Sequence, residues 1–295
     1  MPQLLIVGFG DIGQRTARLA TSSGFDVSVA SRSIELKASE QDAALNLFTA
    51  NLDRLGTLGG LPTKQSMILY LAPPPPHGIT DPRVQNFCNS IRKGELPVKI
   101  VYVSTSGVYG DCSGDLVNET RPPHPETDLA KRRADAEKSF RKWGMAHGVP
   151  IIILRVAGIY GPGRLPVQRL KEGTPVLRKD QAPYSNRIHA DDLARVCLAA
   201  VQKGTDGSIY NVCDGEESTM TDYFKAVADM YGLPEPPVIS MAEAQTALSP
   251  EMLSYLLESR RLDNSRMIDR LGVELLYPEL EQGLSAIRDE MLEKE

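Results

Sequence analysis

The amino-acid sequence predicts an α/β protein built on a doubly wound parallel sheet. Three observations predict this fold class: short apolar runs that recur along the chain, segments between most of them that are long enough for crossover helices, and a glycine-rich turn directly after the first run. Continuous apolar runs of this length are typical of strands buried on both faces of a sheet. The runs are Leu4–Val7, Asp26–Ala30, Met67–Leu71, Lys99–Val103, Ile151–Leu154 and Ile209–Val212.

Helices are expected in the segments between these runs and near the end of the chain. They are Gln14–Ser23, a helix from Thr127 or Asp128 to Gly144, Met220–Tyr231 and Met252–Leu257. The regular alternation loosens after Ile159, where glycines and prolines keep the chain irregular to about residue 186. We therefore expect a first domain over residues 1–160, to which a strand within 187–213 returns. A smaller region is expected over residues 161–186 and 214–295.

Composition excludes several classes of protein. Of 295 residues, 41% are hydrophobic, and no apolar run approaches the roughly 18 residues that a transmembrane helix needs. The first residues lack the basic and long apolar stretches of a signal peptide. The net charge of −5 argues against nucleic acid as a partner. Four scattered cysteines and four scattered histidines fit reduced thiols and no metal site. We expect a cytoplasmic protein with a small-molecule substrate and neither a nucleic-acid nor a membrane partner.

The turn Gly8-Phe9-Gly10-Asp11-Ile12-Gly13 lies between the first strand and the first helix. Glycine permits a tight turn, lets backbone N–H groups approach a pyrophosphate, and lets the helix pack closely on the strand. The helix N-terminus adds a partial positive charge that faces the phosphates. The pattern predicts a dinucleotide-binding turn, and the alternative is a structural turn that binds nothing.

The residues after the second strand bear on which dinucleotide is bound. An acidic residue about 20 positions after the glycines would bind the ribose 2′-hydroxyl and repel a 2′-phosphate. This chain instead has Ser31-Arg32-Ser33, with Arg32 nineteen residues beyond Gly13. A guanidinium flanked by hydroxyls suits a phosphate, which favours NADP over NAD. The alternative is a solvated arginine on a surface loop.

Several stretches carry a family resemblance. They are Gly8–Gly13, Val101–Gly110, Arg155–Gly163, Arg187–Ala194 and Tyr210–Gly215. In this order, they make the chain resemble the extended and atypical short-chain dehydrogenase/reductase superfamily, the relatives of nucleotide-sugar epimerases and dehydratases. The resemblance implies a Rossmann-type NAD(P)-binding domain and a smaller C-terminal substrate-binding region, with the active site between them. It also leaves a homodimer open, since dimers are common in the superfamily.

The resemblance further implies which residues line the cofactor. Besides the glycine turn with Ser31 and Arg32, they are Asn51, Leu52, Leu71, Ala72, Pro73, Thr105, Arg133, Val156, Ala157 and Gly158. Where the family often has aspartate, this chain has Asn51, whose amide can still exchange hydrogen bonds with adenine.

The family's chemistry uses a Ser or Thr hydroxyl, a tyrosine, and a lysine four residues after that tyrosine. The hydroxyl falls on Thr105, with Ser106 beside it. In the family, a glutamate commonly follows the lysine by four residues, and Glu137 is the natural match. This register puts Leu129 at the tyrosine position and Arg133 at the lysine position. A shifted register, Thr127 with Lys131, restores the lysine, but neither register supplies a phenol.

Other side chains are candidates for the missing acid. Tyr109 and Tyr160 both end predicted strands on the cofactor side, and either could supply a phenol or merely pack its ring. His189 precedes Asp191 and Asp192 at a helix start, which favours a structural role. His77 is expected to be solvated. Cys112 lacks a base partner in the sequence.

Two functions follow from these observations. The first is an NADP-dependent reductase or epimerase-like oxidoreductase acting on a carbonyl or carbinol carbon held by Thr105 or Ser106, with the proton from Tyr109, Tyr160 or water. The second is a catalytically impaired NADP-binding sensor or scaffold, favoured by Leu129 and Arg133. A group of cationic residues could meet an anionic substrate such as a nucleotide diphosphate, or be ordinary surface charge. They are Arg155, Arg164, Arg169, Lys171, Arg178 and Arg187.

Overall fold

The structure of the protein is a computed structural model that describes residues 1–33, 44–249, 253–254 and 256–292. The helix expected over Met252–Leu257 lies in part outside the described residues. Within them, no helix has the length and apolar character needed to cross a membrane.

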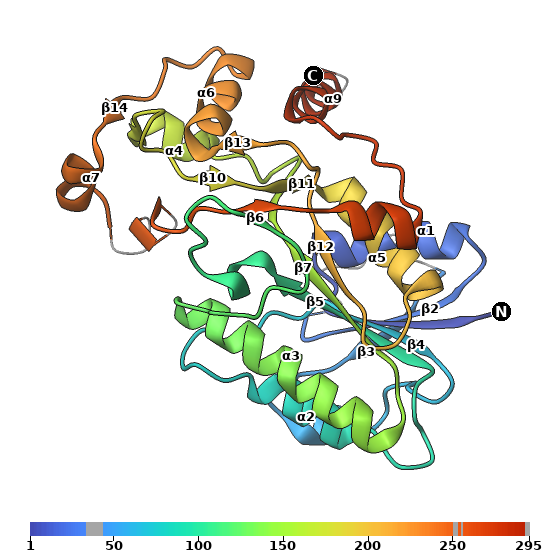
Figure 1. Ribbon diagram of the computed structural model, residues 1–295. Coiled ribbons are helices and arrows are strands. Elements are labelled where there is room, and N and C mark those ends of the chain that lie inside the picture. Colours follow the sequence, from blue (N-terminus) through green and yellow to red (C-terminus); the bar gives the residue numbers. More distant parts are fainter. Residues whose placement is uncertain (34–43, 250–252, 255, 293–295) are drawn as a thin grey trace.

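A seven-stranded sheet forms the centre of the molecule, in the order β12-β7-β5-β4-β1-β2-β3. Every neighbouring pair in it is parallel, which confirms the predicted fold class (Figure 1). The bounds are Gln3–Val7 (β1), Asp26–Ser31 (β2), Asn46–Thr49 (β3), Met67–Tyr70 (β4), Lys99–Thr105 (β5), Ile151–Val156 (β7) and Ile209–Val212 (β12).

The apolar runs located six of these strands to within two residues at each end. They did not include β3, which lies at the edge of the sheet and pairs only with β2. Three of its four residues are exposed, so the strand lacks the continuous apolar character of a central strand. Only the resemblance drew attention to this part of the chain, because it implies that Asn51 and Leu52, just after β3, line the cofactor.

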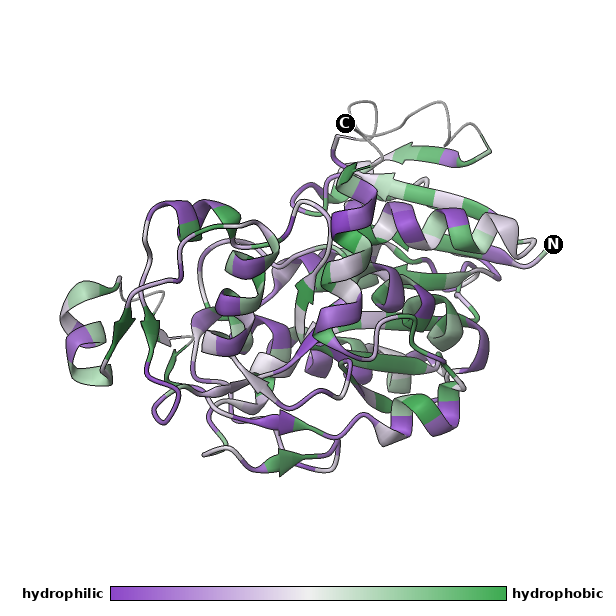
Figure 2. Cartoon of the chain, turned by 90° about the horizontal axis from the view of Figure 1, so that it is seen from above, coloured by the Kyte–Doolittle hydropathy of each residue, from purple (hydrophilic) through white to green (hydrophobic). Residues whose placement is uncertain are grey.

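Helices cover both faces of the sheet. Helices α1 (Asp11–Ser22) and α5 (Ala190–Lys203) lie on one face, and α2 (Pro82–Ser90) and α3 (Asp128–His147) lie on the other (Figure 1). Two apolar clusters fill the spaces between the helices and the sheet, one beneath each helix pair. The strands are mostly hydrophobic along their length, whereas the helices alternate hydrophilic and hydrophobic positions (Figure 2). This pattern is expected when a sheet is buried on both faces and helices on only one.

The predicted end of α3 at Gly144 is wrong. The helix continues to His147 and ends at Gly148, whose φ of +66° is the left-handed conformation that glycine adopts at helix ends. Gly144 is needed for close packing instead, because a Cβ there would lie 2.4 Å from Cγ1 of Ile151. A glycine required by a neighbouring strand cannot be distinguished in sequence from one that ends a helix.

The remaining elements gather beyond one end of the central sheet, in the upper part of Figure 1. They are β6 (Leu116–Val117), β8 (Gly158–Tyr160), α4 (Val167–Lys171), β9 (Val176–Leu177), β10 (Tyr184–Ser185), β11 (Arg187–His189), β13 (Ser218–Thr219), α6 (Met220–Met230), β14 (Val238–Ile239), α7 (Met241–Ala247), β15 (Arg261–Leu262) and α9 (Leu280–Leu292). Short 3-10 turns, η3 (Leu55–Thr57) and η4 (Ser106–Tyr109), and a π-helical turn, η5 (Met267–Leu271), complete the chain. Residues of α4, α6 and α9 share a third apolar cluster.

Candidate functional site

The strand order indicates where a ligand would bind, in the crevice that this fold class has outside the carboxyl ends of its strands. The chain reverses its direction of travel across the sheet between β1 and β4, and in open α/β sheets ligands bind outside the carboxyl ends of the strands at such a point. The glycine turn follows β1, Arg32 follows β2, Leu71 follows β4, and Thr105 ends β5. The sequence-predicted cofactor residues therefore share one edge of the sheet. Of those that carry side chains, Phe9, Ile12, Leu52, Ala72, Val156 and Ala157 are buried.

The glycine turn is shaped by two close approaches of the backbone. Gly8 has a φ of +109°, and a Cβ on it would lie 2.7 Å from the backbone nitrogen of Ala72. A Cβ on Gly13 would lie 2.4 Å from the carbonyl oxygen of Gly8, so α1 can pack this closely on β1 only with glycine. Around Gly10 a Cβ would meet no described atom within 4 Å. Helix α1 begins after Gly10 without a side-chain cap, which leaves its first N–H groups for a ligand.

Asp11 connects this turn to the irregular segment after β8. Its carboxylate accepts hydrogen bonds of 2.7 Å from Nε of Arg15 and from Nε of Arg164. Burial by itself would raise the pKa of Asp11, but the hydrogen bonds and the positive charges of Arg164 and Arg15 together outweigh it, and the pKa lies below its usual value. Arg164, one of the cationic candidates for an anionic substrate, is therefore paired at the mouth of the glycine turn.

The residues after β2 and β3 differ in how they are held. Arg32 is exposed, and its guanidinium has no hydrogen bond or ion pair within the described residues. The side chain of Asn51 accepts from the N–H of Asp53 (3.0 Å), which fixes the turn after β3. Arg83 then pairs with Asp53 (2.7 Å) and donates to the carbonyl of Pro73 (3.0 Å). The loops after β3 and β4 are thus joined by Arg83, which sequence reasoning did not single out.

Thr105 and Ser106 lie at the carboxyl end of β5. Oγ1 of Thr105 accepts from the N–H of Gly107 (3.2 Å) and so caps η4, which leaves the hydroxyl proton of Thr105 able to donate. Ser106 is buried at 7% exposure. Gly158, the last of the predicted cofactor residues, is exposed at the start of β8.

Helix α3 and its N-cap contain the residues of both alignments with the family's tyrosine and lysine, which are Leu129 with Arg133 and Thr127 with Lys131. Thr127 caps the helix, because its Oγ1 accepts from the N–H of Ala130 (3.2 Å). Leu129 is 45% exposed. Arg133 reaches back to the sheet, where its Nη1 donates to the carbonyl of Val103 (3.0 Å) and to the hydroxyl of Tyr102 (3.3 Å). The register with Leu129 and Arg133 therefore places a cation against β5.

The geometry of Tyr109 and Tyr160 favours the packing alternative for both. Tyr109 is 1% exposed, and its hydroxyl donates to Oδ1 of Asn211 (2.7 Å). Tyr160 is also 1% exposed, and its hydroxyl lies so close to α9 that a Cβ on Gly283 would be 2.2 Å away. Burial raises the pKa of both phenols, which disfavours their ionisation.

The other candidate acids have structural or solvated surroundings. His189 caps α5, because its Nδ1 accepts from the N–H of Asp191 (3.2 Å), and burial lowers its pKa. His77 is exposed. Cys112 is 2% exposed, and burial raises the pKa of its thiol, which opposes a nucleophilic role.

A buried ion pair lies behind Thr105, and sequence reasoning assigned one of its members differently. Arg155 is 2% exposed, and its Nη2 lies 2.8 Å from Oε2 of Glu137. Oε1 of Glu137 accepts from the hydroxyl of Ser104 (2.6 Å). The suggestion that Arg155 meets an anionic substrate is therefore wrong, since its counter-charge is internal. The sequence did contain a signal for this ion pair. Arg155 lies within the apolar strand β7, and a charge buried there requires a partner of opposite charge.

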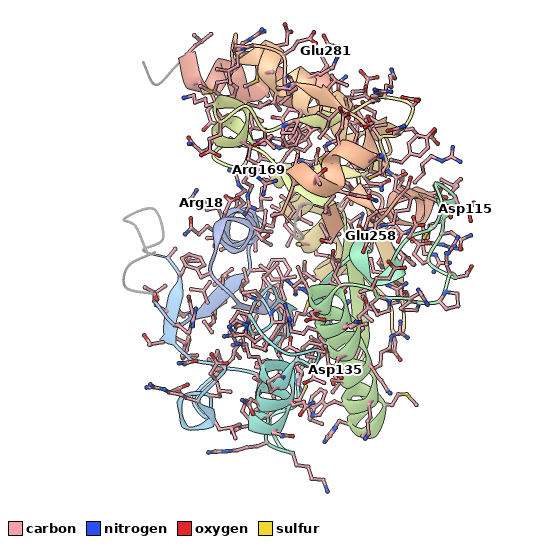
Figure 3. All side chains as sticks on the ribbon, turned by 90° about the vertical axis from the view of Figure 1, so that its left-hand side faces the viewer. Arg18, Asp115, Asp135, Arg169, Glu258 and Glu281 are labelled. Carbon is pink, nitrogen blue, oxygen red and sulfur yellow. The ribbon has the colours of Figure 1, made fainter. Side chains whose placement is uncertain are left out.

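The other cationic candidates divide between buried and exposed. Arg187 is buried, and its guanidinium donates hydrogen bonds to the hydroxyls of Ser185 and Ser218 and to the carbonyl of Thr219. Arg169, Lys171 and Arg178 are exposed, and Arg169, labelled in Figure 3, belongs to the short helix α4. These three remain candidates for contact with an anion.

The buried carboxyl of Asp214 has a raised pKa, which the pH dependence of stability can test. It follows β12 at 6% exposure, and burial raises the pKa of its carboxyl from 3.8 to about 7. The folded state therefore holds this proton more tightly than the unfolded state, and Asp214 makes stability fall as the pH rises from about 4 to about 7. Asp214→Asn removes the titration, so we expect a flatter pH profile and a gain of about 1–3 kcal/mol at pH 8. Urea unfolding at several pH values measures both.

Asp263→Asn is the matched control. Hydrogen bonds from Ser265 lower the pKa of Asp263, so its contribution to stability has the opposite sign and is present at neutral pH. Identical pH profiles for the two variants would contradict the burial of a titrating Asp214.

The fold and the glycine turn together define the class of protein. A parallel sheet with a glycine-rich turn at the reversal point between β1 and β4 is the architecture of Rossmann-type proteins. A sequence model of the NAD dependent epimerase/dehydratase family matches residues 4–213. The chain belongs to this family, within the extended short-chain dehydrogenase/reductase superfamily, as the motifs predicted.

Two curated relatives share part of the chain. Protein YeeZ of Escherichia coli K12 is 28% identical over 196 residues, which cover 66% of this chain and 64% of YeeZ. A human dTDP-D-glucose 4,6-dehydratase is 25% identical over 140 residues, which cover 45% of this chain and 40% of that enzyme. The matched part thus spans less than two thirds of either relative's length.

Solved structures match nearly the whole chain. A conserved protein of unknown function from Silicibacter pomeroyi has a TM-score of 0.82 and 29% identity, with 98% of this chain and 99% of that one covered. A UDP-glucose 4-epimerase from Thermotoga maritima, solved with UDP-glucose, has a TM-score of 0.78 and 20% identity, with 99% of each chain covered. The second likeness shows the fold alone.

Proposed function

We propose that the protein binds NADP and is an oxidoreductase or epimerase acting on a carbonyl or carbinol substrate. The observation that carries this proposal is the turn Gly8–Gly13, where two close backbone approaches need glycine and α1 starts without a side-chain cap. Its first N–H groups would bind the pyrophosphate. Membership of the NAD dependent epimerase/dehydratase family supports the same cofactor class.

In this proposal the cofactor supplies hydride transfer when bound. Thr105 donates its hydroxyl proton in a hydrogen bond to the substrate oxygen, because its own oxygen already accepts from Gly107. Arg133 supplies a fixed positive charge beside it. Since the hydroxyls of Tyr109 and Tyr160 are buried, the proton comes from water.

A nucleotide sugar is the substrate class that we propose. Support comes from relatives whose names are dTDP-D-glucose 4,6-dehydratase and UDP-glucose 4-epimerase. The exposed Arg169, Lys171 and Arg178 would meet the diphosphate. Residues 161–186 and 214–295 would form the substrate-binding region, and residues 1–160, with the strand that returns to them, the cofactor-binding domain.

One observation favours a second function, that of a catalytically impaired NADP-binding sensor or scaffold. In the register that matches Glu137, Leu129 falls at the family's tyrosine position and cannot carry a proton. The hydroxyls of Tyr109 and Tyr160 do not compensate, because both are buried. The two functions share the cofactor site and differ only in turnover.

Calorimetric titration with NADPH and then NADH tests the shared part. We expect binding with a preference for NADPH, and binding of neither would reject both functions. A panel of nucleotide sugars and carbonyl compounds, monitored by NADPH absorbance and product analysis, then separates an enzyme from a sensor.

The variant Arg32→Ala tests the choice of cofactor. Because a guanidinium makes charge-assisted hydrogen bonds with the 2′-phosphate, we expect NADPH affinity to fall about tenfold to a hundredfold and NADH affinity to change little. Arg92→Ala is the matched control, an exposed arginine just past the end of α2. Equal losses for the two cofactors would reject the assignment of Arg32.

A further inference from the structure

We infer that Tyr102 is a positioning residue that fixes the guanidinium of Arg133 at the carboxyl end of β5, where Arg133 binds the nicotinamide half of the cofactor. The inference rests on the proposed function, because it requires a dinucleotide in the crevice. It accounts for how Arg133 can act at the position that the register with Glu137 aligns with the family's lysine.

The first step is the anchor of Arg133. Its Nη1 donates to the carbonyl of Val103 (3.0 Å) and to the hydroxyl of Tyr102 (3.3 Å). The ring of Tyr102 is fully buried and packs on Phe140 and Tyr70, with ring centroids 5.1 and 5.9 Å apart. A phenol enclosed in this way cannot move far, so its hydroxyl holds Arg133 in one orientation.

The second step concerns the N–H groups of Arg133 that Val103 and Tyr102 do not use. A guanidinium has five N–H donors, and the two acceptors contact only Nη1. Within the described part of the chain, Nε and Nη2 of Arg133 make no hydrogen bond or ion pair, and the side chain is half-buried, not enclosed. Three N–H donors therefore stay available to a ligand. A lysine has a single nitrogen and could not bond both backbone and phenol and still present a planar fork.

The third step is location. A dinucleotide whose adenosine lies near Arg32, after β2, extends across the reversal point toward β4 and β5. Arg133 contacts β5 and thus meets the nicotinamide ribose or its neighbouring phosphate, both of which carry oxygen acceptors. Tyr102 is not itself the proton donor, since it is fully buried and burial raises its pKa to about 12.

Calorimetric titrations with two ligands test this assignment: NADPH, and adenosine 2′,5′-bisphosphate, which lacks the nicotinamide half. We expect Tyr102→Phe to weaken NADPH binding about fivefold and Arg133→Gln to weaken it about tenfold or more, with the bisphosphate unaffected by either. The double variant should be no weaker than Arg133→Gln, because Tyr102 acts only through Arg133. Arg133→Lys should also lose affinity and provides a second variant with the charge retained.

Tyr70→Phe is the matched control. Tyr70 is also fully buried, lies on the neighbouring strand β4, and its hydroxyl has no hydrogen-bond partner among the described residues. NADPH affinity should not change in this variant. Equal effects of Tyr102→Phe and Tyr70→Phe, or equal losses for both ligands, would overturn the inference while leaving the cofactor proposal intact. Failure of the native protein to bind any dinucleotide would overturn both.

Discussion

Replacing Glu137 with alanine is expected to lower the free energy of unfolding by about 3–5 kcal/mol. The loss follows because the guanidinium of Arg155, 2% exposed, would keep its charge without a counter-charge. Its Nη1 already lacks a hydrogen-bond partner within the described residues. The hydroxyl of Ser104 would lose its acceptor as well. Urea unfolding at pH 7, followed by circular dichroism, measures the change.

Two further variants separate a buried pair from a surface one. Asp115→Ala breaks the more exposed pair with Arg121 and should cost less than about 1 kcal/mol. The double variant of Glu137→Ala with Arg155→Met should recover part of the loss, because no charge remains unpaired. A loss below about 1 kcal/mol for Glu137→Ala would contradict the burial of this pair.

The second large effect is expected in the glycine turn. In Gly13→Ala the added methyl would lie 2.4 Å from the carbonyl oxygen of Gly8, a backbone atom that cannot turn aside. Helix α1 must then move away from β1. We expect a loss of about 2–3 kcal/mol in the free energy of unfolding and at least a tenfold loss of NADPH affinity.

Gly10→Ala distinguishes folding from binding within the same turn. The added methyl meets no described atom within 4 Å, and the φ of −93° at Gly10 is accessible to alanine. Stability should stay within about 0.5 kcal/mol of the native protein. NADPH affinity should nevertheless fall about tenfold, because the methyl occupies the space through which a pyrophosphate approaches the backbone. Native affinity in this variant would reject the turn as the pyrophosphate site.

The sequence contained enough to predict the sheet and to propose a site at the carboxyl ends of its strands. The run Ile151–Leu154 lies wholly within β7, a central strand that is buried at every position, because a strand buried on both faces has a continuous apolar pattern. The need for glycine at position 13 was also predictable, since its close contact is with Gly8 in the same βα unit, whereas the contact of Gly8 is with Ala72 after β4. Local patterns suffice where both partners are close in sequence.

What could not be predicted depends on partners from helices and strands that are distant in the sequence. The sequence placed a cation at Arg133 but gave no sign that Tyr102, thirty-one residues earlier, would contact it. The roles of Tyr109 and Arg155 were equally hidden, because Asn211 and Glu137 reach them from other elements. Spacing along the chain does not record which side of a strand or helix a buried polar group meets.

The return of the chain to the central sheet has a consequence for modularity. Strand β12 pairs with β7, and the amide of Asn211 donates to the carbonyls of Val117 and Asp263. A fragment that stopped at residue 160 would therefore expose one edge of β7 and uncover the sheet beneath α5, a surface that invites aggregation. A cut at this junction therefore does not yield two self-sufficient parts. An exchange of the segments before and after residue 160 would break the sheet itself, because it would separate β12 from β7.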